Sequence, residues 1–129
     1  MLNIKNKIVV KIPNNDPEIV EVDFHDEYRA VDKIKKYIGI NYIETVNIFA
    51  QHKNSEIANI IMLVDEEGKL KNMPLNFVIS NGIYFDHIVG GVAFVSTMYD
   101  EDEMSDVFNG LSDLQISFIN ELFDSVDQY

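Results

Sequence analysis

The chain has 129 residues and a mass of 14.8 kDa, a length typical of a single domain. Hydrophobic residues make up 47% of it, which is enough for a sizeable core and excludes a disordered tail. The absence of cysteine excludes disulfides, thiol catalysis and cysteine-based metal centres. No apolar run approaches the ~18 residues of a membrane span, and the N-terminus lacks a signal-peptide core, so we expect a cytoplasmic protein.

The charge is strongly negative and unevenly distributed. Ten basic and 22 acidic residues give a net charge of −12, and no Lys or Arg follows Lys71. Such a field repels nucleic acid phosphates and anionic lipid, and it attracts basic protein surfaces. We therefore expect no direct contact with nucleic acid or membrane. Acidity also favours solubility, so the charge has a purely physical explanation as well.

The N-terminal part predicts a strand pair. Apolar and other residues alternate over Lys7–Ile12 and over Glu18–Phe24, as in half-buried strands. Between them, two prolines bracket Asn and Asp residues at positions 13–17, which is typical of a turn. The two strands would form a hairpin.

A helix is predicted over Glu27–Ile38, with Asp26 as its N-cap and Gly39 as the residue that ends it. Three lysines near its C-terminal end suit the negative end of the helix dipole, which explains them without a phosphate site. The residues expected on the buried face are Tyr28, Val31, Ile34 and Ile38.

The middle of the chain predicts further strands. Tyr42–Ala50 and Ala58–Asp65 are rich in β-branched and aromatic residues and are joined by the polar loop Gln51–Ile57. Residues 72–86 contain several breakers and predict a short helical or irregular excursion. Ile88–Met98 is the strongest strand candidate, and its two glycines indicate a bulge or a close backbone approach.

Tyr99–Asn109 is predicted to be an acidic loop, and a C-terminal helix follows it. Ser112 and Gln115 have the spacing of a capping box at the start of this helix. Its expected buried residues are Leu111, Leu114, Phe118, Leu122 and Val126, with Ile119 and Phe123 beside them. The whole chain, residues 1–129, is thus expected to form one α+β domain, with a mostly antiparallel sheet of about five strands packed by two helices.

Several segments in order resemble one known family. The helix end Ile34–Gly39 with the strand Tyr42–Val46, the stretch from Leu63 to Asn76, the stretch Asp86–Val95 and the helix start at 111–113 are similar to the family called domain of unknown function 3846. The similarity covers about residues 13–126. It implies a compact α+β domain encoded by an accessory gene of a phage, plasmid or integrated element, and hence a location in the host cytoplasm. It implies no reaction.

The chain departs from the family pattern at one position. The family usually has an arginine after the Asn of the second segment, and here Phe77 takes its place. Any anion contact that this arginine makes in relatives is therefore missing here.

The sequence gives little support to an enzyme, a cofactor or a metal site. The three histidines, His25, His52 and His87, are far apart, and no nucleophile has an evident activating base. A phosphate-binding glycine loop is also missing. We therefore expect a non-enzymatic protein.

The first functional hypothesis uses the acidic C-terminal half. The protein would be a counter-defence inhibitor that binds a host nucleic-acid-handling or defence protein stoichiometrically, by docking on a basic surface. The expected partner-binding residues are Asp100, Glu101, Asp102, Glu103 and Asp106, with acids of the last helix.

The second hypothesis is a small-molecule binder that sequesters a nucleotide immune signal. Asn76 and Asp86 would bind the base, Tyr84 or Phe85 would stack on it, and Lys69 or Lys71 would contact phosphate. Both polar residues also have a simple structural explanation, because Asn76 could cap a short helix and Asp86 could close a turn.

A third hypothesis is a structural or regulatory module with no ligand, which the sequence does not separate from the first. An exposed strand edge would also be covered if the chain formed a symmetric homodimer.

Overall fold

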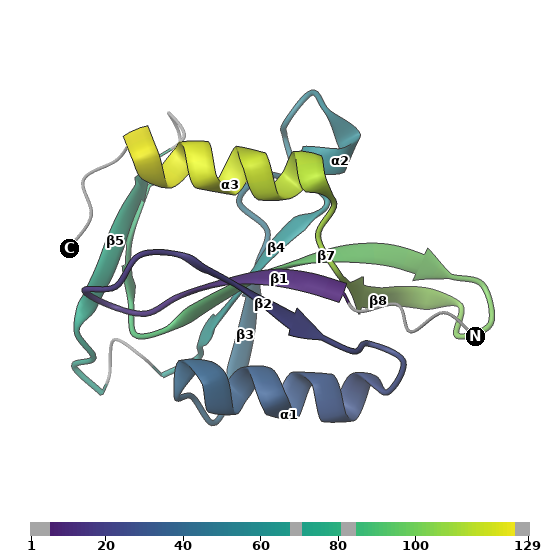
Figure 1. Ribbon diagram of the computed structural model, residues 1–129, viewed down its shortest axis with the longest axis horizontal. Coiled ribbons are helices and arrows are strands. Elements are labelled where there is room, and N and C mark those ends of the chain that lie inside the picture. The colour runs from purple at the N-terminus through teal and green to yellow at the C-terminus, as the bar shows by residue number, and fades with distance from the viewer. Residues whose placement is uncertain (1–5, 68–70, 81–84, 126–129) are drawn as a thin grey trace.

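The computed structural model describes residues 6–67, 71–80 and 85–125. They form an antiparallel sheet with a helix layer on each side, α1 on one face and α2 with α3 on the other (Figure 1). The predicted α+β class is confirmed. None of the helices in these residues has the length and the apolar run that a membrane crossing needs.

The main sheet has six strands, in the order β2-β1-β7-β4-β3 with β8 paired to β7, and every pairing is antiparallel. Its strands are β1 (Asn6–Lys11), β2 (Glu18–Val22), β3 (Ile43–Val46), β4 (Ile60–Asp65), β7 (Val92–Asp100) and β8 (Ser105–Asn109). The predicted hairpin of the first two strands is confirmed, with Ile8 opposite Val20.

Strand β7 lies at the centre of this sheet and is buried on both faces. Successive side chains of a strand point to opposite faces. Ala93 and Val95 accordingly belong to the apolar cluster under α1, and Val92 and Phe94 to the cluster under α3. The run from Val92 to Val95 is apolar at every position because both faces are covered.

Helix α1 (Glu27–Ile38) has the predicted bounds and caps. The side chain of Asp26 accepts a hydrogen bond from the Arg29 amide, and Gly39 adopts a left-handed conformation with φ of 70°. One part of its predicted buried face is wrong, because Tyr28 is 83% exposed and Ala30 is buried instead. The helix is rotated about its axis relative to the prediction, so that Ala30, Ile34 and Ile38 face the sheet.

Helix α3 (Asp113–Ser125) begins at the predicted capping box. The Gln115 amide donates to the Ser112 hydroxyl, and the Ser112 amide donates to the Gln115 side chain. Gln115 is itself buried, and it also donates to the Ser96 hydroxyl on β7. Because Gln115 faces the sheet, the helix is rotated about its axis relative to the prediction. Leu114 is therefore 47% exposed and Ile116 is buried, contrary to prediction. Val126 lies outside the described residues.

Two predicted irregular stretches contain regular structure. Residues 72–86 were expected to form an irregular excursion, but they contribute to a two-stranded ribbon of β5 (Leu75–Ser80) and β6 (Phe85–Val89). The predicted loop 51–57 contains the helical turn α2 (Ser55–Ala58), capped by Asn54. The predicted strand 42–50 is shorter, because the chain turns at residues 48–50 and buries Ile48 and Phe49.

The predicted single strand Ile88–Met98 is two strands. Gly90 has a φ of +71°, and the chain changes sheets between β6 and β7 at this point. Gly91 next to it lies directly under the last turn of α1. A Cβ at Gly91 would lie 2.7 Å from the Cβ of Ile38 and would also collide with the Ile38 carbonyl oxygen. The two glycines therefore mark a change of sheet, and Gly91 makes the close backbone approach that was predicted as the alternative to a bulge.

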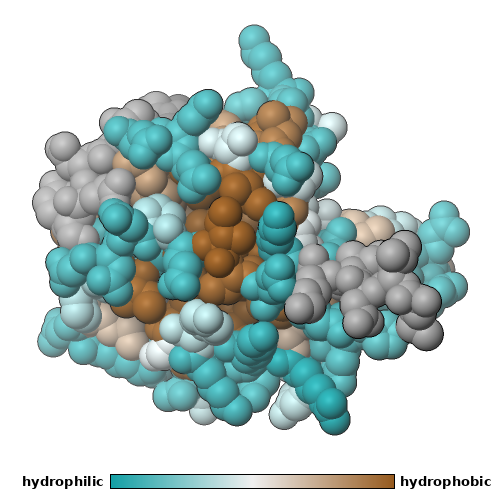
Figure 2. Space-filling view, in the orientation of Figure 1, coloured by the Kyte–Doolittle hydropathy of each residue, from teal (hydrophilic) through white to brown (hydrophobic). Residues whose placement is uncertain are grey.

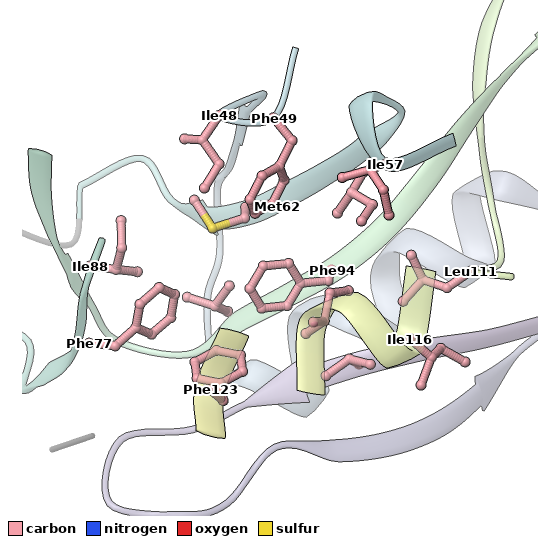
Figure 3. Close-up of a cluster of buried hydrophobic side chains, with 14 residues drawn as sticks. Ile48, Phe49, Ile57, Met62, Phe77, Ile88, Phe94, Leu111, Ile116 and Phe123 are labelled. Atoms are coloured by element: carbon pink, nitrogen blue, oxygen red, sulfur yellow. The ribbon is translucent and has the colours of Figure 1, made fainter. Parts of the chain in front are cut away.

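Aromatic rings fill the core between the sheet and α3 (Figure 3). Phe123 makes edge-to-face contacts with Phe77 and Phe94, at centroid separations of 5.0 and 5.8 Å. Phe77 comes from β5, so this contact attaches the two-stranded ribbon to the main core. Such pairs add about 0.5–1.5 kcal/mol each beyond the burial of their area.

Replacing Gly91 with alanine should destabilise the chain more than replacing Gly39. Alanine at 91 would push the end of α1 away from the sheet, at an expected cost of about 2–3 kcal/mol. A Cβ at Gly39 meets nothing within 4 Å, so Gly39→Ala carries only the cost of its positive φ, about 1 kcal/mol. Urea unfolding of both variants measures the difference, and equal losses would contradict the close packing at Gly91.

Candidate docking site

The predicted acidic loop 99–109 is a β-hairpin that projects from the sheet. Strand β4 pairs with β7 only as far as Ser96, whereas β8 pairs with β7 from Ser96 to Asp100. The last residues of β7 therefore leave the body of the molecule together with β8, on the right of Figure 1. We call residues 97–108 the acidic hairpin. The prediction of a loop was wrong because the turn contains no glycine or proline to mark it.

The side chain of Asp100 stabilises the turn of the hairpin in the absence of glycine and proline. One oxygen of Asp100 accepts hydrogen bonds from the amides of Asp102, at 2.9 Å, and Glu103, at 3.3 Å. This is the usual way in which an aspartate organises a turn. Met104 closes the turn with a φ of 52°, in the left-handed region. Asp100 therefore has a structural role in the hairpin in addition to its charge.

The other acids of the hairpin are exposed, and they have no ion pairs within the described part of the chain. Glu101, Asp102, Glu103 and Asp106 are all exposed, and none has an ion pair with a described residue. The ion pairs between described residues lie elsewhere: Arg29–Asp26, Lys36–Asp32, Lys71–Asp65 and Lys71–Glu67. The structure thus brings all five predicted partner-binding acids together on one projecting element.

Large apolar side chains accompany these charges. Met98, Tyr99 and Met104 are between 51% and 79% exposed on the same hairpin. The projection on the right of Figure 2 is nevertheless mainly hydrophilic in colour over its described residues. Exposed aromatic and methionine side chains within a polar rim are typical of protein interfaces. Sequence reasoning missed these three residues because it assigned Met98 to the strand Ile88–Met98 and the other two to a loop.

A groove of about 680 Å³ separates the acidic hairpin from the start of α1. Its lining residues are Phe24, His25, Asp26, Glu27, Asp100, Glu103, Ser105, Asp106, Val107 and Phe108. Five of them are acids and none is Lys or Arg. We call this space the acidic groove. Its two walls are about 75 residues apart in the sequence, and the pairings of β2 with β1, β1 with β7 and β7 with β8 bring them together.

Asn76 is buried and has a structural role. Its side chain is fully buried and donates to the carbonyl oxygens of Lys11, at 2.7 Å, and Gly90, at 2.8 Å. Its oxygen accepts from the Lys11 ammonium group at 2.9 Å. A nucleotide base could reach this amide only by displacing these bonds. Asn76 therefore joins β5 to β1 and does not cap a helix, contrary to the structural interpretation given above.

The remaining residues of the nucleotide hypothesis do not form a described site. Lys71 is paired with Asp65, at 3.3 Å, and with Glu67. Asp86 and Phe85 belong to β6, and Asp86 lies opposite Ile79, so Asp86 does not close a turn. Their side chains lie outside the described part of the chain, as do Lys69 and Tyr84 altogether.

The three histidines lie apart from one another in the fold. His25 lines the acidic groove, His52 packs edge-on against Phe118, and His87 is on β6. Within the described residues, no group of three or more His, Cys, Asp or Glu side chains is placed to hold a metal ion.

The comparisons with known proteins identify the family. A family model described as a domain of unknown function, DUF3846, matches residues 4–124. The chain belongs to this family. No curated protein and no solved structure matches it. Membership of DUF3846 confirms the resemblance predicted from the sequence and adds no activity to it.

The buried side chain of Lys11 should affect the pH dependence of stability. Burial lowers the pKa of Lys11 below its usual 10.5, and the charge of Asp16 opposes part of this shift. Between the lowered pKa and 10.5, the unfolded chain binds more protons than the folded chain. The free energy of unfolding should therefore gain a contribution that rises with pH across this window.

Lys11→Met should remove this contribution. The difference in unfolding free energy between the parent chain and the variant, measured in urea from about pH 7 to 10.5, is expected to increase with pH. Lys7→Met removes an exposed lysine from the same strand and is the matched control. An identical pH slope in the parent and in Lys11→Met would contradict the effect of burial.

Proposed function

We propose that this DUF3846 chain is a non-enzymatic accessory protein of a phage or other mobile element. It inhibits a host nucleic-acid-handling or defence protein by docking the acidic hairpin on a basic surface of that protein. One observation carries the proposal: exposed carboxylates with no ion pair to a described residue are concentrated on an element that projects from the sheet.

The position of the charge favours recognition over solubility alone. Acids that only confer solubility need no particular place, and they are commonly interspersed with bases. Here four exposed acids lie within six residues, 101–106, at the end of a two-stranded projection. A projecting element can enter a concave basic site, such as one that holds phosphates, where the flat face of a sheet cannot.

The exposed apolar side chains give the hairpin a means of binding tightly. Exposed charges steer association and add little affinity each, whereas buried aromatic and methionine side chains supply much of the energy of an interface. Tyr99 and Met104 are the available anchors. The expected interface therefore has an apolar centre from the hairpin and a rim of carboxylates.

Removing charge from residues 101–103 at the hairpin tip should weaken capture of basic host proteins. The variant Glu101→Gln/Asp102→Asn/Glu103→Gln keeps the shape of the turn and removes three charges, and it should bind a captured partner about tenfold more weakly. The matched control Glu18→Gln/Glu44→Gln/Glu66→Gln removes three exposed charges from other parts of the chain. Each immobilised protein is exposed to host lysate, and the captured proteins are identified and then purified.

A purified partner then tests inhibition directly. It should lose its nucleic acid when one equivalent of the parent chain is added, and the hairpin variant should fail to displace it. Binding that is unchanged in the hairpin variant, or a partner that keeps its nucleic acid at saturation, would contradict the proposal.

The same complex should weaken steeply with salt. Screening shortens the range of exposed charges from about 10 Å at 0.1 M salt to about 3 Å at 1 M. We expect the association rate to fall most, because the charges act mainly on the encounter. Surface plasmon resonance at several salt concentrations measures this, and a rate independent of salt would argue against electrostatic docking.

A further inference from the structure

We propose that the acidic groove binds an extended, arginine-bearing segment of the basic partner. This inference rests on the proposed function and deepens it, because it assigns a second contact region beside the hairpin tip. The tip would meet the partner's surface, while the groove would hold one segment of its chain.

The groove offers carboxylates that the fold does not use. Asp26 already caps α1 and pairs with Arg29, and Asp100 already organises the hairpin turn. Glu27, Glu103 and Asp106 have no hydrogen bond or ion pair from their side chains to any described residue. Three unpaired carboxylates therefore face one space from two walls, one of them the start of α1 and the other the hairpin.

The arrangement of these acids does not suit a single metal ion. A divalent metal needs several oxygen ligands converging within about 2.6 Å of one point. No such group exists among the described residues, although five acids line the groove. The acids therefore do not converge on one point, which suits several positive groups carried on one chain better than a single ion.

The groove also has apolar walls, which favour arginine over lysine. Phe24 and Phe108 are half-buried and pack against the core under α1, so their rings are held in place from behind. Val107 lines the groove beside them. An arginine can lay its stem and its flat guanidinium group on such surfaces and still bind a carboxylate with two hydrogen bonds. The more strongly hydrated lysine ammonium group gains less from this combination.

The size of the groove fits a segment better than a single ion. Its volume of about 680 Å³ lies within the ~300–1,000 Å³ range of pockets that enclose organic ligands. The acids are accessible from solvent, because four of the five that line the groove, Asp26, Glu27, Glu103 and Asp106, are exposed. An extended chain can therefore enter and leave the groove without a change in the fold.

Three variants, each lacking two charges, separate the groove from the tip. Asp26→Asn/Glu27→Gln alters only the groove, and asparagine at 26 keeps an oxygen for capping α1. Glu101→Gln/Asp102→Asn alters only the tip, because neither residue lines the groove. Glu44→Gln/Glu66→Gln is the distant control. Circular dichroism and urea unfolding establish that each variant is folded.

The probes are fluorescein-labelled nona-arginine and nona-lysine peptides, with binding followed by fluorescence anisotropy at low salt. We expect the parent chain to prefer nona-arginine several-fold. The groove variant should lose about tenfold in affinity for nona-arginine, and the distant control should stay within about twofold of the parent. The preference for arginine should disappear in the groove variant.

The possible failures are distinguishable. If only the tip variant loses affinity, the docking proposal stands and the groove inference is overturned. Equal losses in the tip and groove variants, or equal affinity of the parent for the two peptides, would show general charge attraction and also overturn it. If neither variant differs from the distant control, both the groove inference and the proposed docking surface are wrong.

Discussion

The arrangement of the helices around the sheet depends on the central strand β7. This strand must be covered on both faces over part of its length. From Val92 to Val95 its side chains are fully buried, under α1 on one face and α3 on the other. Both helices are therefore needed to exclude water from a single strand. Beyond Ser96 the strand loses its neighbour β4, and its residues become exposed. The same strand thus forms the core and carries the acidic hairpin away from it.

A second constraint comes from a buried polar contact. Where the chain passes from β6 to β7, the Gly90 carbonyl has no strand partner, and the side chain of Asn76 supplies its hydrogen bond. The same amide donates to the Lys11 carbonyl oxygen and accepts from the Lys11 ammonium group, which also donates to the Ile12 carbonyl oxygen at 3.1 Å. A buried lysine bonded only to neutral groups bears a desolvation penalty. These directional bonds nevertheless fix the position of the β5–β6 ribbon against β1, which non-directional apolar contacts alone would not determine.

The sequence predicted what depends on neighbouring residues. Asp26 with Gly39, and Ser112 with Gln115, defined the two long helices because caps are local chemistry. Pairings set at a distance were missed: the acidic hairpin has no glycine in its turn, and the β5–β6 ribbon lies in a stretch full of breakers. The five hairpin acids were found from charge alone. The groove was not, since its walls meet only in the folded sheet.

The separation between core and hairpin also has a functional consequence. Residues 98–100 of β7 pair with β8 and not with β4, so substitutions there change one edge of a projecting ribbon, away from the central packing. The acids of the tip can therefore vary with the surface that they meet, while the alternation of Phe94 and Val95 stays fixed by the two helices. The groove is less free, because Phe24 and Phe108 belong both to its wall and to the core cluster under α1. A chain built in this way can change the partner that its tip contacts more readily than the kind of segment that its groove accepts.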